Sequence, residues 1–256
     1  MNNKLTALFE NKQAGILNVY CTAGFPELDS LPAVLEALQD NGADIIEIGI
    51  PYSDPIADGP VIQQSNMAAL ANGMTIPNLF SQLNELKNSS RVPLILMGYL
   101  NPVMQYGIER FCEDAAGAGI SGIILPDMPM YAFEKMYKPV FKKYNLAFIF
   151  LITPQTSEAR IRKADQLSDG FLYAVSSPGV TGGSIDIEDQ TAYFQRLVLM
   201  KLKNPFLIGF GIANKKSFEF ACKYAAGAII GSAYIKALSG TAGIAQNTAN
   251  FIKTLK

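Results

Sequence analysis

The chain has 256 residues, of which 49% are hydrophobic and 17% charged, with a net charge of −1 and a mean hydropathy of +0.17. No basic cluster favours a nucleic-acid or anionic-membrane partner, and no apolar run approaches the roughly 18–20 residues of a membrane span. Histidine is absent, which excludes Ser-His-Asp and Cys-His catalysis and histidine-ligated metal sites. Acid–base chemistry must therefore use Asp, Glu, Lys, Tyr or Cys.

The amino-terminal residues and the cysteines both suggest a cytoplasmic protein. The sequence opens on a short polar stretch, "MNNKLTALFENKQ", rather than on the basic and then apolar pattern of a secretory signal. Cys21, Cys112 and Cys222 are odd in number and far apart, without the spacing of a metal site. A reducing compartment suits such cysteines best.

Eight short apolar runs, most of them followed by a helical pattern, succeed one another along the chain. The expected strands begin at Ile16, Asp44, Val92, Ile120, Leu146, Gly170, Pro205 and Gly227. Helical segments between them include "LDSLPAVLEALQDNG", "GIERFCEDAAGAG", "SEARIRKADQLS" and "KSFEFACKYAAG". Several of these end at Gly, the usual stop signal of a helix.

Eight strand–helix units in 256 residues predict an α/β protein, a closed (β/α)₈ TIM barrel. A doubly wound open sheet is the alternative, but it usually has fewer strands and a Gly-rich first turn, which this sequence lacks. No linker or composition break divides the chain, so we expect residues 1–256 to form one domain.

Strand spacing predicts extended loops after strands two and six. Most strands start 22–28 residues apart, whereas 48 residues separate Asp44 from Val92 and 35 separate Gly170 from Pro205. Loop two contains "PYSDPIADGP" and loop six contains "SSPGVTGGSI". Both follow the carboxyl ends of strands, where this fold builds its active sites.

Two acidic positions stand out near strand two. Glu47 interrupts the apolar run "DIIEIGI", and a charge in a strand covered on both faces is costly unless it is paired or used. Burial should raise the pKa of its carboxyl group, which suits a proton shuttle. Asp58 precedes the expected helix "GPVIQQSNMAAL", so a helix cap and a functional role are both open for it, and Asp54 has the same turn-forming context.

Glycine-rich segments after strands seven and eight predict a phosphate site. These are "GFGIA" from Gly209 and "GSAYI" from Gly231, with "GVTGG" from Gly179 in loop six. Backbone N–H groups and a helix beginning at Ser232 can hold a phosphate dianion there. The alternative is that these glycines only turn the chain.

The segment "DIIEIGIPYSDPIADGPVIQQS" closely resembles the signature of the tryptophan synthase alpha chain family. The segments "VYCTAGFP", "MGYLNPV", "LPDMP", "GVTG", "GFGI" and "GSA" resemble it too, in order over nearly the whole chain. The resemblance implies a (β/α)₈ barrel and a retro-aldol cleavage of indole-3-glycerol phosphate to indole and glyceraldehyde 3-phosphate, without a cofactor or metal. It also implies a cytoplasmic enzyme of tryptophan biosynthesis with a beta-chain partner in an α₂β₂ heterotetramer.

The resemblance assigns roles residue by residue. Glu47 takes the place of the general acid–base, and Asp58 that of the carboxylate that holds the indole N–H. Phosphate-binding positions fall on Gly182, Gly211, Gly231 and Ser232, and the indole pocket on Tyr20, Tyr99, Ile124, Tyr173 and Phe210. Thr181 takes the place of a lid threonine, with Asp54 as its expected partner, and Ser177–Pro178 stands where some members carry arginine.

Three other functions remain open at this point. A phosphate-binding isomerase of the same pathway would share the barrel, but the strand-two signature argues against it. A non-catalytic barrel acting as an allosteric subunit conflicts with the presence of Glu47 and Asp58. A stand-alone indole-3-glycerol-phosphate lyase would have the same sequence features, since only intrinsic activity separates it from the synthase subunit.

Overall fold

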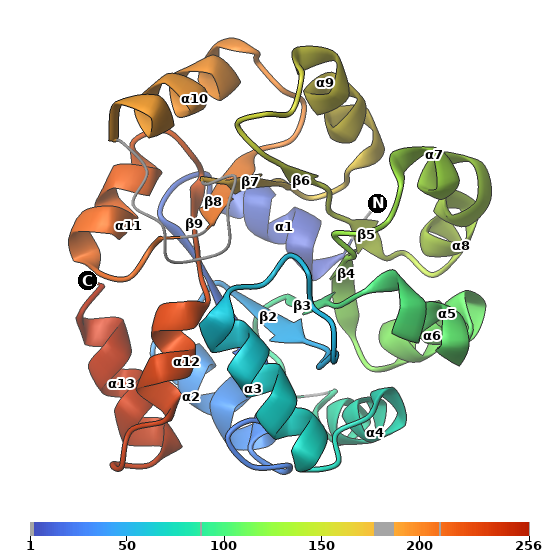
Figure 1. Ribbon diagram of the computed structural model, residues 1–256, viewed down its shortest axis with the longest axis vertical. Coiled ribbons are helices and arrows are strands. Elements are labelled where there is room, and N and C mark those ends of the chain that lie inside the picture. Colours follow the sequence, from blue (N-terminus) through green and yellow to red (C-terminus); the bar gives the residue numbers. More distant parts are fainter. Residues whose placement is uncertain (1–2, 88, 177–186, 210, 256) are drawn as a thin grey trace.

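The computed structural model describes residues 3–87, 89–176, 187–209 and 211–255. They form one curled parallel sheet surrounded by a ring of helices (Figure 1). The hydrogen-bonded order of its strands is β5-β4-β3-β2-β1-β9-β8-β7-β6. The strands are β1 (Ile16–Thr22), β2 (Ile45–Gly49), β3 (Leu94–Met97), β4 (Ile120–Ile124), β5 (Ala147–Phe148), β6 (Leu151–Ile152), β7 (Leu172–Val175), β8 (Phe206–Gly209) and β9 (Gly227–Ile230).

The two end strands of this order, β5 and β6, are successive parts of one chain segment. The Ile149 N–H donates to the Ile123 carbonyl on one side, and the Tyr173 N–H donates to the Phe150 carbonyl on the other. One segment thus bonds to β4 and then to β7, and so joins the two edges of the sheet. The prediction of a TIM-barrel-like fold is confirmed, and the expected fifth strand is the one that is split.

Helices connect the strands on the outside of the barrel. Those that alternate with strands in the predicted way include α2 (Leu31–Asp40), α4 (Ile76–Leu86), α6 (Ile108–Gly117), α8 (Lys138–Lys143), α9 (Glu158–Leu167), α10 (Ile187–Leu199), α11 (Lys215–Cys222) and α13 (Ile244–Lys253). Additional helical segments are α1 (Lys4–Asn11), α3 (Pro60–Ala71), α5 (Leu100–Tyr106), α7 (Met130–Ala132), the π-helix η1 (Phe133–Tyr137) and α12 (Ser232–Leu238). No helix in the described part of the chain is both long and apolar enough to cross a membrane.

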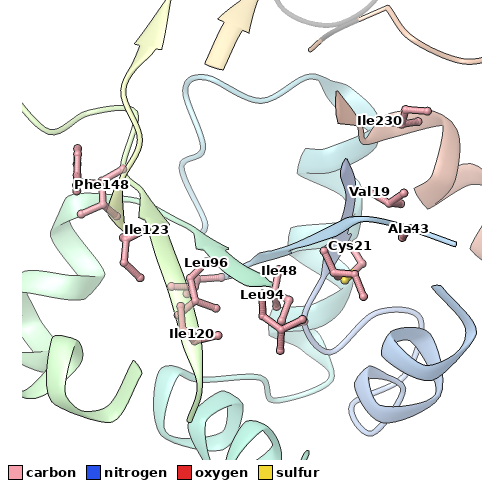
Figure 2. Close-up of a cluster of buried hydrophobic side chains, with 14 of the residues drawn as sticks. Val19, Cys21, Ala43, Ile48, Leu94, Leu96, Ile120, Ile123, Phe148 and Ile230 are labelled. Carbon is pink, nitrogen blue, oxygen red and sulfur yellow. The ribbon is translucent and has the colours of Figure 1, made fainter. Parts of the chain in front are cut away.

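Side-chain alternation along the strands divides the core into two layers. Outward residues such as Val19, Ile48 and Leu96 pack under the helices in one cluster, part of which is drawn in Figure 2. Inward residues such as Ile45 and Ile95 fill the barrel in a second cluster. Every residue of β1 to β4 is buried, as expected for parallel strands covered on both faces.

The amino end of the barrel is filled by α1, which lies in the middle of the ring of helices (Figure 1). Leu5 is fully buried in the inward cluster with Ile16 and Ala147. The Phe9 ring lies 5.7 Å from the Phe171 ring, centroid to centroid. This apolar plug leaves the carboxyl ends of the strands as the end where a cavity can form.

The additional residues after β2 form a loop and a helix. Segment 50–59 leaves the carboxyl end of β2, and α3 then packs beside α12. The Ser65 hydroxyl on α3 lies 2.7 Å from the Thr22 hydroxyl at the end of β1, which ties this helix to the barrel. The extended loop predicted after the sixth strand, β7, lies largely outside the described residues.

Candidate active site

A cavity of about 510 Å³ lies at the carboxyl end of the barrel. Its walls come from strand ends, from the segments that follow β2, β8 and β9, and from the end of α13. The lining residues are Tyr20, Glu47, Asp58, Gly59, Val61, Ile62, Met97, Tyr173, Gly211, Ile212, Ala213, Ile229, Gly231, Ser232, Ala233, Lys236, Phe251 and Thr254. Most are apolar, with a few polar groups among them, the usual character of a small-molecule site.

Glu47 lies on β2 at an inward position, between the Ile45 and Gly49 positions that share its face. Its side chain is 1% exposed, and its Oε2 accepts a hydrogen bond of 2.9 Å from Asn18 Nδ2 on β1. Burial raises the pKa of the Glu47 carboxyl group to about 8, while the bond from Asn18 opposes this shift. The carboxyl group is therefore mostly protonated at neutral pH.

Asp58 lies in the segment after β2, and its side chain does not cap α3. The N-cap residue of α3 is Gly59, which makes no side-chain cap bond, whereas Asp58 Oδ2 accepts a 3.0 Å bond from the Tyr99 hydroxyl. The Ala57 N–H donates to the Tyr99 oxygen at 3.0 Å, so the hydroxyl is held in place from both sides. Burial raises the pKa of Asp58 to about 6, and the bond from Tyr99 limits the rise. Asp58 is therefore mostly ionised at neutral pH.

The side chains of two tyrosines each lie directly over a glycine of the neighbouring strand. A Cβ atom on Gly49 would lie 2.0 Å from the Tyr20 hydroxyl oxygen, and one on Gly209 would lie 2.4 Å from the Tyr173 ring. Both rings line the cavity, so the glycines make the space in which these rings lie. Thr22 donates to the Tyr20 hydroxyl at 3.3 Å.

The predicted phosphate-binding region has the features of an anion site. Gly211 has φ +76°, a conformation that favours glycine, and a Cβ atom there would meet nothing within 4 Å. Gly231 precedes α12, and the Ser232 hydroxyl oxygen is buried without a hydrogen-bond partner among the described residues. Lys236, one turn further along α12, also lines the cavity.

The structure brings together most of the residues predicted to form the site. Those that line the cavity are Glu47, Asp58, Gly211, Gly231, Ser232, Tyr20 and Tyr173. Tyr99 contacts Asp58 instead of lining the cavity, and Ile124 is fully buried in the inward cluster without lining it. Asp54 is exposed, and its carboxylate accepts a bond from Ser53. Gly182, Phe210 and Thr181 lie outside the described residues.

Sequence reasoning missed two polar residues near the cavity. Asn18 follows the inward alternation of β1, so its position opposite the strand of Glu47 was readable from the strand pattern. Lys236 stands four residues after Ser232, a spacing that places two side chains on the same face of a helix. The glycine-rich segments "GFGIA", "GSAYI" and "GVTGG" contain no Lys or Arg, but Lys236 reaches the cavity from α12.

The cavity thus places a carboxyl group that favours the neutral form and one that favours the ionised form beside apolar and aromatic walls. A protonated, desolvated Glu47 can deliver a proton, and an ionised Asp58 can hold a polarised N–H group. This arrangement suits reactions that move protons on a flat aromatic substrate.

Comparison with known proteins gives the family. A model of the family described as tryptophan synthase alpha chain matches residues 6–256. The tryptophan synthase alpha chain of Parabacteroides distasonis is 47% identical over 255 residues, with 99% of each chain covered. That of Flavobacterium johnsoniae is 51% identical over 240 residues, covering 93% of this chain and 94% of the relative.

The chain belongs to the tryptophan synthase alpha chain family. Solved structures agree: a chain of Mycobacterium tuberculosis tryptophan synthase superposes with a TM-score of 0.89 at 30% identity, covering 100% of this chain and 97% of that one. Tryptophan synthase subunit alpha from Legionella pneumophila gives 0.89 at 29% identity, with the same two coverages. As a tryptophan synthase alpha chain, this protein is a lyase of tryptophan biosynthesis that cleaves indole-3-glycerol phosphate.

Proposed function

We propose that Glu47 is the general acid–base of this cleavage and that Asp58 stabilises the developing positive charge on the indole ring. The observation that carries this proposal is the pair of carboxyl groups on one cavity, Glu47 at 1% exposed and Asp58 at 7% exposed. Burial raises the pKa of Glu47 to about 8 and that of Asp58 to about 6, so the first favours the protonated form at neutral pH and the second the ionised form. Tyr20 and Tyr173 supply apolar walls for a flat ring. Tyr99, Ile124 and Phe210 are proposed to complete the indole pocket.

The proposed steps balance with one proton donor. Glu47 gives its proton to indole C3, and Asp58 accepts a hydrogen bond from the ring N–H while positive charge develops there. The hydroxyl on the carbon attached to C3 then loses its proton to Glu47, and that carbon–oxygen bond becomes a carbonyl. The C3–carbon bond breaks, its electron pair restores the aromatic ring, and indole and glyceraldehyde 3-phosphate result. Glu47 ends protonated, as it began.

The substrate phosphate is proposed to bind between Gly211 and the start of α12, with Gly231 and Gly182 contributing backbone N–H groups. The unpartnered Ser232 hydroxyl can donate to a phosphate oxygen, and Lys236 adds a positive charge at the rim. Lys236→Met should raise KM for the substrate several-fold with a smaller effect on kcat. Lys142→Met, on α8 outside the barrel, is the matched control and should leave KM unchanged.

Indole release by the purified protein tests the catalytic assignment. Glu47→Gln and Asp58→Asn should keep the fold and lose roughly 10²–10⁴-fold in turnover, the range of a positioned acid–base group. Glu113→Gln, an exposed residue on α6, is the matched control and should retain full turnover. Near wild-type turnover in either site variant would refute the assignment.

We also propose that a beta chain docks at the carboxyl end of the barrel, in an α₂β₂ heterotetramer. Large apolar side chains are exposed on the segments that follow β2, β3 and β4: Ile56 at 81%, Met104 at 54% and Tyr131 at 74%. Exposed apolar groups that gather on one face of a protein are typical of interaction surfaces, whereas scattered ones are not. They lie beyond the carboxyl ends of the strands, the same end as the cavity.

Turnover at rising concentrations of a cognate beta chain tests the docking surface. Tyr131→Asp should weaken the stimulation at least tenfold and leave basal turnover within about twofold, because burying a carboxylate in an apolar interface is costly. Leu199→Asp, a matched change at an 80% exposed position on α10, should leave the stimulation intact. Absence of stimulation of the unaltered protein would favour a stand-alone lyase.

The remaining assignments are proposed on the resemblance. Thr181 is proposed to close over the bound substrate by a hydrogen bond to Asp54. The Asp54 carboxylate is exposed, and it can accept such a bond in addition to the one from Ser53. Residues 1–256 are proposed to act as one domain. The three cysteines are all unpaired, which supports a cytoplasmic location.

A further inference from the structure

Asn18 is a fully buried polar residue in the apolar interior of the barrel. It lies on β1 between Ile16 and Tyr20 on the inward face, and pairs with Ile45 of β2 in the strand register. Its Nδ2 donates to Glu47 Oε2 at 2.9 Å. Its Oδ1 is also buried and has no hydrogen-bond partner among the described residues.

Packing does not account for an asparagine at this position. A buried amide with one unsatisfied oxygen costs stability, whereas an apolar side chain of the same volume would not. The inward positions around it are held by Ile16, Ile45 and Ile229, which shows that the layer accepts apolar side chains. The polar group that Asn18 contacts is the Glu47 carboxyl group. We therefore expect Asn18 to act on the position or the charge of that carboxyl group.

We propose that Asn18 is a positioning residue that holds the Glu47 carboxyl group in both of its protonation states. The proposal rests on the proposed role of Glu47, which must change its protonation state twice in each turnover. When Glu47 is ionised, the Asn18 amide N–H donates to its carboxylate, in the orientation that the amide has in the structure. When Glu47 is protonated, the amide turns over about its Cβ–Cγ bond, and Oδ1 accepts the carboxyl proton.

The amide can turn over in this way because its Oδ1 has no other hydrogen bond to break among the described residues. The two ends of an amide have nearly the same size and reach, so turning it over changes no packing. An apolar side chain could form a hydrogen bond with neither protonation state of Glu47. A lysine, which only donates, would stabilise the ionised state alone. Asn18 thus keeps the carboxyl group at one place while its proton leaves and returns.

Several other titratable groups lie near Glu47. Tyr20 and Cys21 on β1 and Tyr173 on β7 interact with it, and burial raises the pKa of each, so all three stay neutral near pH 8. The charge of Asp58 raises the pKa of Glu47. Lys236 lines the same cavity from α12.

The test compares Asn18→Leu with Asn18→Ala. Leu fills the site and removes both hydrogen-bonding ends, so kcat should fall about tenfold or more while KM changes less than about threefold. Ala leaves space in which a water molecule can replace the amide, so its kcat should fall less. A role in packing alone predicts the opposite order, because Ala leaves a cavity and Leu does not.

The pH profile supplies a second measurement. Asn18→Leu removes the bonds to both protonation states, but a hydrogen bond to an ionised carboxylate is the stronger of the two. The alkaline limb of kcat/KM should therefore move upward by about one pH unit. Asn66→Leu is the matched control, since Asn66 on α3 is likewise buried, at 2% exposed, and also has an unpartnered Oδ1. That control should show no shift of the limb.

Carbon-13 NMR titration of the Glu47 carboxyl group measures the same change in pKa without relying on turnover. The Glu47 signal is assigned by its absence from the spectrum of Glu47→Gln. An unmoved titration in Asn18→Leu, or lower turnover in Ala than in Leu, would overturn the proposal. If Glu47→Gln is inactive while the Asn18 variants behave as wild type, only the role of Asn18 fails. If Glu47→Gln retains turnover, the proposed function of Glu47 fails as well.

Discussion

At the scale of single residues, Glu47 and Asp58 illustrate how two carboxyl groups on one cavity acquire different charge states. Burial raises the pKa of both, but Glu47 is nearly inaccessible and Asp58 is somewhat less so. Each also accepts one hydrogen bond that opposes the shift, from Asn18 and from Tyr99. The larger desolvation at Glu47 leaves it protonated where Asp58 is ionised.

These two values predict a bell-shaped dependence of kcat/KM on pH. Activity should fall as pH decreases through about 6, where Asp58 takes up a proton, and as pH increases through about 8, where Glu47 loses its own. The substrate phosphate titrates near pH 6 as well, so its ionisation is measured separately by phosphorus NMR and removed from the profile. A profile that keeps rising well above pH 9 would contradict a protonated Glu47 as the starting acid.

The buried carboxyl group should also make the protein less stable at alkaline pH. The folded pKa of Glu47 lies above its unfolded value, so the folded state binds the extra proton and its stability declines as pH rises from about 4.5 to about 8. Glu47→Gln removes this dependence. Its unfolding free energy relative to wild type should increase by on the order of 3 kcal/mol between pH 5 and pH 8.5, measured by urea unfolding. An equal difference at both pH values would contradict the raised pKa.

At the scale of elements, strand glycines position the aromatic walls of the cavity. In Gly49→Ala the new methyl group would lie 2.0 Å from the Tyr20 hydroxyl oxygen, so the Tyr20 ring would have to leave its place in the inward cluster. We expect about 1–3 kcal/mol of destabilisation and a several-fold rise in KM, since Tyr20 lines the cavity. Thermal unfolding and steady-state kinetics measure the two effects.

The control for this change is Gly117→Ala at the end of α6. A Cβ atom there would meet nothing within 4 Å, so stability should stay the same or rise slightly. If both alanine variants behaved alike, the close approach of Tyr20 to Gly49 would not be the cause of the loss.

Sequence patterns predicted the elements well where periodicity decides them. The eight apolar runs are all strands, and "GPVIQQSNMAAL" does begin a helix at Pro60. The split of the fifth strand into β5 and β6 was not predictable, because "LAFIFLIT" is uniformly apolar and the break depends on which edge each half bonds to. The role of α1 was missed too, since its polar composition conceals the buried Leu5.

The site was predictable to the extent that strand order fixes it. Residues at the carboxyl ends of strands, such as Glu47 and Gly231, had to converge once the barrel was recognised. The partner of Asp58 was not predictable, because its contact with Tyr99 joins loops whose paths the sequence does not specify. Lys236 was overlooked because it lies on a helix beyond the glycine segment.

At the scale of the whole molecule, stability and binding are separated along the barrel axis. Leu5 fills the amino end and does not line the cavity, so Leu5→Ala should destabilise the protein by about 2–5 kcal/mol without changing KM. Leu199→Ala, at an 80% exposed position, should cost less than about 0.5 kcal/mol. Urea unfolding and steady-state kinetics measure the two quantities. A changed KM in Leu5→Ala would mean that the two ends are coupled.

The apolar plug at the amino end has a kinetic consequence. With α1 packed against Phe171 and Ile16, substrate and both products share the carboxyl end as their route. A second substrate molecule must therefore wait until both fragments have departed, and each fragment should compete with incoming substrate. A protein chain that binds over that end would therefore control the order in which substrate enters and products leave, without contacting a reacting atom.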